Sequence, residues 1–230
     1  MENILVIGSS NTDLITTMDH FPAAGETLTG GVFQQAMGGK GANQALAAHR
    51  SGGDVTFMTS LGKDAYGLNA LQYYRDQGLE VSLSLLTDHV SSGIAMIWVD
   101  KKGENCIVVI PGANLLLSPE YVLAHQQAID TADIIVLQME IPYETIKTVC
   151  RIASRKGKKI ILNVAPALLQ MARSYRVSDR DLLTGVYLPS IVPYMVSGVS
   201  AAVGITWKVV IAAEVLAMPV HSVGTKMQNA

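Results

Sequence analysis

Hydrophobic and polar positions alternate in blocks over the first two-thirds of the chain. Short apolar runs rich in Val and Ile, of the length of buried strands, recur between segments with helical periodicity. The predicted strands lie at residues 4–8, 55–60, 81–86, 134–138 and 159–164. The predicted helices lie at residues 41–50, 65–77, 118–129 and 143–155. This alternation predicts an α/β domain with an open, mostly parallel sheet.

Two segments depart from the alternation and predict a small β appendage on this sheet. Residues 25–36 place Thr, Val and Phe between glycines without a helical period, which favours a two-stranded excursion. Residues 93–99 and 105–110 are apolar runs on either side of a charged, glycine-containing turn, as in a β-hairpin. The run IAMIWV within the first of them would expose a large apolar surface without a partner.

The character of the chain changes after about residue 167. Residues 170–181 are polar, and no charged residue occurs from 182 to 207. A stretch of roughly 20 apolar residues is long enough to cross a bilayer. Prolines, glycines and serines interrupt this one, so a membrane-derived segment and a buried helix of a soluble domain both remain open.

Charge and composition exclude several classes of function. With 17 basic and 19 acidic residues the formal charge is −2, so we expect no binding to nucleic acid. The two cysteines and five histidines are scattered without the spacing of metal ligands, so we expect no metal site. The first residues lack the basic and apolar regions of a signal peptide, and we therefore expect a cytoplasmic protein.

Amide and carboxylate side chains gather around a glycine-rich stretch. Asn11 and Asp13 follow the first predicted strand, and Asn43 ends the run GGKGAN at residues 38–43. Sugar hydroxyls both donate and accept hydrogen bonds, so a sugar site needs fixed side chains of these kinds. Adjacent glycines let the backbone approach a ligand closely. Taken singly, each residue also fits an ordinary turn.

The glycine run, followed by Ala45, Gly52 and Gly62, resembles the first signature of the phosphofructokinase-B-type carbohydrate kinases, to which ribokinase belongs. Further matching segments follow in the family's order at residues 8–13, 21–27, 112–114, 138–140 and 163–167. The resemblance covers residues 1 to about 167. It implies a ribokinase-like fold whose β lid, at about 26–36 and 93–110, covers the sugar and pairs with a second copy to form a homodimer.

The resemblance also implies the site and the reaction. Residues that line a ribose pocket in this family match Asn11, Asp13, Gly38, Gly39, Lys40, Asn43 and Glu140, and the lid adds apolar contacts from Ala95 and Ile97. The family transfers a phosphoryl group from ATP, with Mg²⁺, to the 5-hydroxyl of D-ribose. Its Gly-Ala-Gly-Asp segment, which carries the catalytic base, is absent from this sequence. We therefore assign no catalytic residue and expect an inactive chain that keeps only the sugar-binding half.

Residues 168–230 resemble something else. The segments at 171–178 and 182–193 are similar to the cytoplasmic coupling loop of a binding-protein-dependent transporter permease, and the apolar stretch behind them to its next membrane segment. This resemblance implies a chimera with a helical, membrane-associated tail. A diverged kinase tail and a non-catalytic sugar-binding or dimerising fragment are the alternatives.

Overall fold

The computed structural model describes residues 2–164, which lie within one compact unit of the chain, Met1–Ala167. Its main sheet has the order β10-β9-β1-β4 and all its neighbouring strands are parallel. The four strands are β1 (Asn3–Ile7), β4 (Asp54–Met58), β9 (Ile134–Gln138) and β10 (Lys159–Asn163). The predicted open parallel sheet is thus confirmed.

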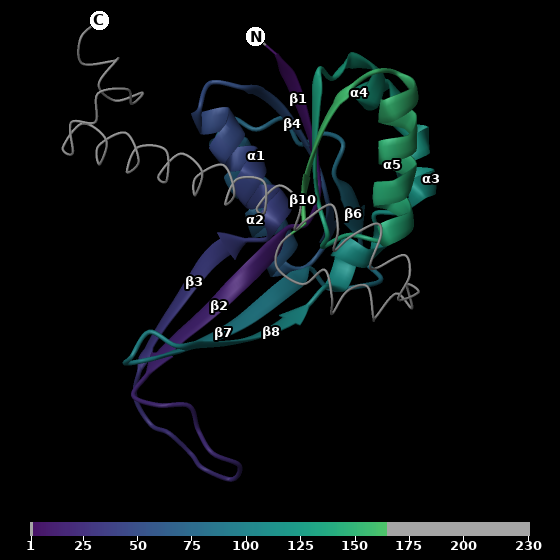
Figure 1. The fold of residues 1–230 in the computed structure, drawn as a ribbon. Coiled ribbons are helices and arrows are strands. Elements are labelled where there is room, and N and C mark those ends of the chain that lie inside the picture. The colour runs from purple at the N-terminus through teal and green to yellow at the C-terminus, as the bar shows by residue number, and fades with distance from the viewer. Residues whose placement is uncertain (1, 165–230) are drawn as a thin grey trace, which may run out of the picture. The chain divides into compact units, whose positions relative to one another are not determined.

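Helices cover both faces of the main sheet (Figure 1). One face carries α1 (Lys40–Arg50) and α2 (Ala65–Asp76), and the other carries α3 (Pro119–Ala124), α4 (Gln126–Thr131) and α5 (Tyr143–Arg155). Alternation along the strands divides the core between these faces. In β1, Val6 packs with the α1 and α2 cluster, whereas Leu5 and Ile7 pack with the other cluster.

A second sheet, hereafter the lid sheet, extends away from the helices in Figure 1. Its order is β3-β2-β7-β8, formed by β3 (Val32–Gly38), β2 (Asn11–Met18), β7 (Gly93–Asp100) and β8 (Asn105–Ile110). Strands β2 and β7 are parallel, and the outer pairs are antiparallel. The predicted hairpin at 93–110 is therefore present, but its first strand pairs with β2 as well.

The prediction for the segments flanking the lid was partly wrong. Residues 11–18 form a strand that the pattern of apolar residues did not predict, and residues 25–36 contribute only one strand, β3. The segment NTDLITTM of β2 is rich in threonine, and five of its eight residues are polar; one end of it faces the site described below. Its partners, β3 and β7, come later in the chain, so local pattern gave little sign of it.

Two smaller predictions also needed correction. The predicted strand at 81–86 is a strand only at its end: residues 81–84 form a turn with irregular flanks, and strand β6 (Leu85–Thr87) follows, pairing with β5 (Ser60–Gly62). The predicted helix at 118–129 breaks at His125. The His125 ring is hydrogen-bonded to the Tyr121 carbonyl, and the His125 N–H donates instead to Val122, three residues back. The carbonyl that would continue the helix is therefore partnered by a side chain.

Within residues 2–164, no helix is long and apolar enough to cross a membrane. The charge-free segment at 182–207 and the predicted helical tail at 168–230 lie outside the described residues.

Candidate functional site

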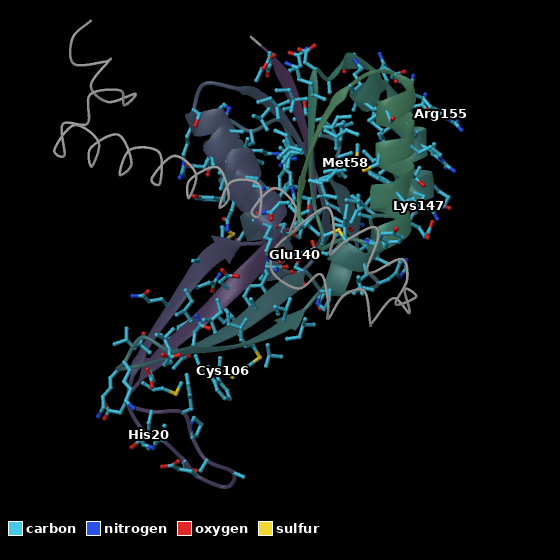
Figure 2. All side chains as sticks on the ribbon, viewed as in Figure 1. His20, Met58, Cys106, Glu140, Lys147 and Arg155 are labelled. Carbon is cyan, nitrogen blue, oxygen red and sulfur yellow. The ribbon has the colours of Figure 1, made fainter. Side chains whose placement is uncertain are left out.

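Three chain segments meet where the carboxyl edge of the main sheet joins the lid sheet. Residues 8–10 connect β1 to β2, α1 begins directly after β3, and Glu140 follows β9. Figure 2 shows Glu140 at this junction, with His20 beyond the far end of the lid sheet. Ligands of open α/β sheets bind at this edge of the strands.

The first turn of α1 receives its hydrogen-bond partners from other segments. Its residue before the helix, Gly39, has no side chain to cap the free N–H groups. Instead the Lys40 N–H donates to Glu140 Oε2 at 3.0 Å, and the Gly41 N–H donates to Ser9 Oγ at 3.3 Å. The Ala42 N–H donates to the Ser9 carbonyl at 2.9 Å. Glu140 and Ser9 thus fix the start of the helix against the ends of β9 and β1.

Both carboxylate oxygens of Glu140 are engaged. Oε2 also accepts from Ser9 Oγ at 2.6 Å, and Oε1 forms an ion pair with the Lys40 ammonium. Burial raises the pKa of Glu140, but the hydrogen bonds from Lys40 and Ser9 outweigh it and the pKa is lowered overall. The negative charge also lies at the positive end of the helix dipole. Glu140 therefore stays ionised and holds Lys40 in place.

Glycine is required at two positions of this bend. Gly39 has a φ of +88°, and a Cβ there would lie 2.9 Å from the Ser9 carbonyl oxygen. A Cβ on Gly41 would lie 2.5 Å from the Ser9 backbone nitrogen. The glycine run predicted a close approach of the backbone to a ligand, and the structure shows a close approach of α1 to the loop after β1.

Asp13 lies on β2, beside the glycine bend. Its carboxylate occupies the space that a side chain on Gly38 would need. Burial, followed by the charge of Glu140, raises the pKa of Asp13, whereas Lys40 lowers it less. The half-buried Asp13 is therefore close enough to Lys40 and Glu140 to interact with both charges, and the space beside these three side chains is the candidate site.

The other predicted residues occupy different positions around this space. Asn11 is buried at the start of β2, and Ala95 on β7 lies directly opposite Asp13. Ile97 lies two residues further along β7, opposite Ile15. Asn43 is in the first turn of α1 with an exposed side chain, and no hydrogen bond of that side chain is recorded in the described part of the chain.

Two residues of this site carried no predicted role. Ser9 bonds Glu140 and the helix, and Asn114 in the 3₁₀ helix η1 (Gly112–Leu116) donates to Asn11 Oδ1 at 2.8 Å. Both belong to segments that resemble the kinase family, at 8–13 and 112–114. Neither contact could be predicted from the spacing of residues, because each joins residues more than 100 positions apart in the chain.

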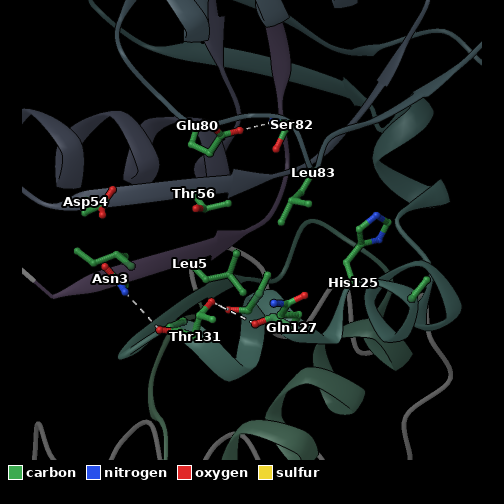
Figure 3. A pocket seen from close by; sticks show the side chains of 14 residues that line it. Asn3, Leu5, Asp54, Thr56, Glu80, Ser82, Leu83, His125, Gln127 and Thr131 are labelled. Atoms are coloured by element: carbon green, nitrogen blue, oxygen red, sulfur yellow. Dashed lines mark hydrogen bonds between the residues drawn. The ribbon is translucent and has the colours of Figure 1, made fainter.

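A hollow of about 470 Å³ lies at the opposite, amino edge of the main sheet (Figure 3). Its lining includes Asn3, Asp54, Glu80 and Thr131. The Asn3 amide donates to the Thr131 carbonyl, and the Glu80 carboxylate accepts from the backbone of Ser82. Since most of these polar groups already have partners, we assign no ligand to this hollow. Within residues 2–164, no three His, Cys, Asp or Glu side chains gather as a metal site.

Comparisons with known proteins identify the family of the chain. The family described as pfkB family carbohydrate kinase matches residues 1–187. A ribokinase of Bacillus subtilis (strain 168) is 43% identical over 167 residues, covering 73% of this chain and 57% of the relative. A deoxyribokinase of Salmonella typhi is 36% identical over 193 residues, covering 80% and 63%. The chain therefore spans little more than half the length of these curated relatives.

A solved structure gives the same result for the fold. The structure of Arabidopsis thaliana ribokinase complexed with ribose and ATP superposes with a TM-score of 0.66 at 28% identity. The match covers 73% of this chain and 54% of that one. The predicted ribokinase-like α/β fold is confirmed.

The comparisons correct the interpretation of the C-terminal segment. The family match continues to residue 187, beyond the predicted boundary at about 167. The resemblance of residues 168–230 to a transporter permease, and the chimera that it implied, are not supported.

Proposed function

The chain belongs to the pfkB family of carbohydrate kinases, and from this premise we propose that residues 1–167 form the sugar-binding part of a ribokinase-type enzyme. The observation that supports the proposal is the Lys40–Glu140 ion pair at the glycine bend, with Asp13 close enough to interact with both charges. A carboxylate accepts hydrogen bonds from sugar hydroxyls, and an ammonium group donates to them. Ala95, opposite Asp13, would supply apolar contact from the lid sheet.

D-Ribose is the substrate that we propose. The GGKGAN run together with Asn11 and Asp13 favours ribose over the fructose and nucleoside substrates of other family members. The Bacillus subtilis relative is a ribokinase and the Salmonella typhi relative a deoxyribokinase, so both carry names of pentose kinases. For the whole enzyme we propose transfer of a phosphoryl group from ATP, with Mg²⁺, to the 5-hydroxyl.

We expect this chain to bind the sugar without turning it over. Phosphoryl transfer needs a base near the accepting hydroxyl and groups that neutralise the transferred phosphate. The resemblance assigns both tasks to a Gly-Ala-Gly-Asp segment, which this sequence lacks. We assign no residue of 2–164 to ATP or to Mg²⁺.

Calorimetric titration of the full chain with D-ribose tests the proposed site, and a coupled assay of ribose-dependent ATP hydrolysis tests the proposed inactivity. We expect saturable binding and no turnover above background. Absence of binding would refute the sugar site, whereas turnover would show that another residue serves as the base.

The raised pKa of Asp13 predicts a pH dependence of ribose binding. Burial and Glu140 raise this pKa, so on acidification Asp13 loses its charge at a higher pH than an exposed aspartate does. The pKa of Glu140 is lowered, so Glu140 stays ionised to lower pH and keeps its hydrogen bond to the start of α1. Ribose affinity should therefore fall with decreasing pH before the circular dichroism signal of the fold changes. Simultaneous loss of binding and fold would contradict this order.

We also propose that the lid sheet pairs with a second copy of the chain. It exposes several large apolar side chains on three of its strands, namely Val32, Phe33, Met96, Trp98, Ile107, Val108, Val109 and Ile110. All six residues of β8 are exposed. Patches of this kind mark protein interfaces.

The dimer proposal predicts the effect of charge on β8. Neighbouring residues of a strand face opposite sides, so the double change Ile107→Lys and Val108→Lys charges both faces of the lid sheet. We expect sedimentation to show a dimer for the unmodified chain and a monomer for this variant. Leu123→Lys, on an exposed apolar residue of α3, is the matched control and should leave the dimer intact. A monomeric unmodified chain at micromolar concentration would rule the dimer out.

A further inference from the structure

Asn114 is a buried amide at the root of the lid sheet whose orientation is fixed by backbone groups. It is 2% exposed. Its Oδ1 accepts from the Ser10 N–H at 2.9 Å. Its Nδ2 faces the carbonyls of Ser10 at 3.1 Å and Pro111 at 2.9 Å, and shares its two hydrogens among these and the Asn11 side chain. A backbone N–H only donates and a carbonyl only accepts. These three bonds therefore determine which end of the Asn114 amide carries the oxygen.

The orientation of Asn114 determines that of Asn11. Asn114 Nδ2 lies 2.8 Å from the Asn11 side chain and has only hydrogens to offer. The atom of Asn11 that faces it must be Oδ1, so the Nδ2 of Asn11 lies at the other end of the amide. In the described part of the chain, no bond from this Nδ2 is recorded, and Asn11 shares a face of β2 with Asp13.

We infer that Asn114 is a positioning residue of the sugar site, which holds the Asn11 amide so that Asn11 presents a hydrogen-bond donor beside the Asp13 acceptor. The inference rests on the proposed sugar-binding function. A sugar oxygen at Asn11 then accepts a hydrogen bond, and a hydroxyl at Asp13 donates one. Asn114 itself does not reach the sugar, because it is buried and both ends of its amide are already bonded.

The hydrogen-bonded pair of Asn11 and Asn114 lies where three strands of the lid sheet join the rest of the unit. Asn11 begins β2, Asn114 follows β8, and a side chain on Gly93, the first residue of β7, would overlap both amides. The position of Asn11 is therefore tied to the place where the lid sheet leaves the main body of the unit. The donor faces the site only while this attachment is intact.

The variant Asn114→Asp tests the inference in the full chain. It keeps the shape and the oxygen that accepts from Ser10, but replaces the donor by a second oxygen. The Asn11 amide must then turn its Nδ2 toward the new carboxylate and its Oδ1 toward the sugar. We expect the affinity for D-ribose to fall about 10-fold or more, measured by calorimetry.

Sugar analogues supply a readout that a purely structural role would not change. Fluorine accepts a hydrogen bond weakly and cannot donate one, whereas a hydrogen substituent does neither. With the unmodified chain, the deoxyfluoro ribose at carbon 2 or carbon 3 should bind tighter than the corresponding deoxyribose at the position that Asn11 contacts. In Asn114→Asp this preference should disappear or reverse. An unchanged preference in the variant would overturn the inference.

Thr145→Val is the matched control. Thr145 is fully buried next to the same segment and donates to the Leu117 carbonyl at 2.7 Å. Its loss should lower thermal stability without changing ribose affinity or analogue preference. Equal effects of both variants on binding would assign Asn114 a purely structural role. If the unmodified chain binds no ribose, the proposed function fails first, and the two failures are thereby distinguished.

A second measurement keeps the inference testable should Asn114→Asp not fold. In the ¹⁵N-labelled unmodified chain, the side-chain NH₂ signals of Asn11 are assigned by their loss in Asn11→Asp. Addition of D-ribose should shift these signals more than those of Asn114. Asn11 signals that stay unchanged at saturating ribose would overturn the donor role.

Discussion

The variant Gly41→Ala is expected to lose about 100-fold in ribose affinity and to unfold more easily by about 1–3 kcal/mol. The added Cβ would lie 2.5 Å from the Ser9 nitrogen and 2.6 Å from the Ser9 oxygen, and backbone atoms cannot move aside as a flexible side chain can. The start of α1 must therefore shift away from the loop after β1. That shift breaks the hydrogen bonds that the Lys40 and Gly41 N–H groups donate to Glu140 and Ser9, and Lys40 then moves away from the site. Calorimetry with D-ribose and chemical denaturation measure the two effects.

Gly52→Ala is the matched control for this glycine. Gly52 follows the other end of the same helix, has a φ of +91°, and leaves open space around an added Cβ. Its substitution costs about 1–2 kcal/mol through backbone strain alone. It should therefore destabilise the chain to a similar extent while ribose binding is retained. Equal loss of binding in both variants would mean that general destabilisation, and not the contact with Ser9, explains the result.

The variant Asp13→Asn should lose about 10-fold to 100-fold in ribose affinity and yet unfold no more easily than the unmodified chain. A hydrogen bond to a charged group contributes about 1.5–3 kcal/mol, which the amide does not replace. Because the pKa of Asp13 is raised by folding, the folded state binds more protons than the unfolded state between the two pKa values. Its ionised form therefore opposes folding above the folded pKa, and asparagine removes that cost at neutral pH.

The stability of this variant should also depend less on pH. In the unmodified chain, the contribution of Asp13 lowers stability as pH rises through the raised pKa, and this decline should be absent in Asp13→Asn. Asp54→Asn, an exposed aspartate at the opposite edge of the main sheet, is the control and should leave binding unchanged. Strong destabilisation by Asp13→Asn would indicate that the carboxylate supports the fold instead of the ligand.

Local pattern predicted those parts of the molecule whose cause is local. The runs that became β1, β4 and β9 are buried and apolar because helices cover both faces of the main sheet, and such runs are visible in the sequence. Ser118 caps α3 and Pro119 is its first residue, both local signals of a helix start. The glycine run predicted a close backbone approach to a ligand, whereas the close contact that requires glycine is that of α1 with the loop at residues 8–10.

Features that depend on long-range contacts could not be predicted from the sequence. Strand β2 has a polar end because Asn11 and Asp13 face the site, so its pattern resembled a loop. Lys40 and Glu140 are 100 residues apart, and their pairing follows from the meeting of α1 and β9. Asn114 belongs to a segment that resembled the family, but its bonds to Ser10 and Asn11 depend on how the chain returns from the lid sheet. The resemblance therefore pointed to the segments that contain these residues, and their contacts became visible only in the folded structure.

The most direct measurement is a crystal structure of the full chain grown with D-ribose. One ribose should lie between the glycine bend and β2, within hydrogen-bond distance of the Asp13 carboxylate and of Asn11 Nδ2, with Asn11 Oδ1 still on Asn114. Ribose bound elsewhere, or an Asp13 carboxylate turned away from it, would contradict the sugar site proposed for this chain.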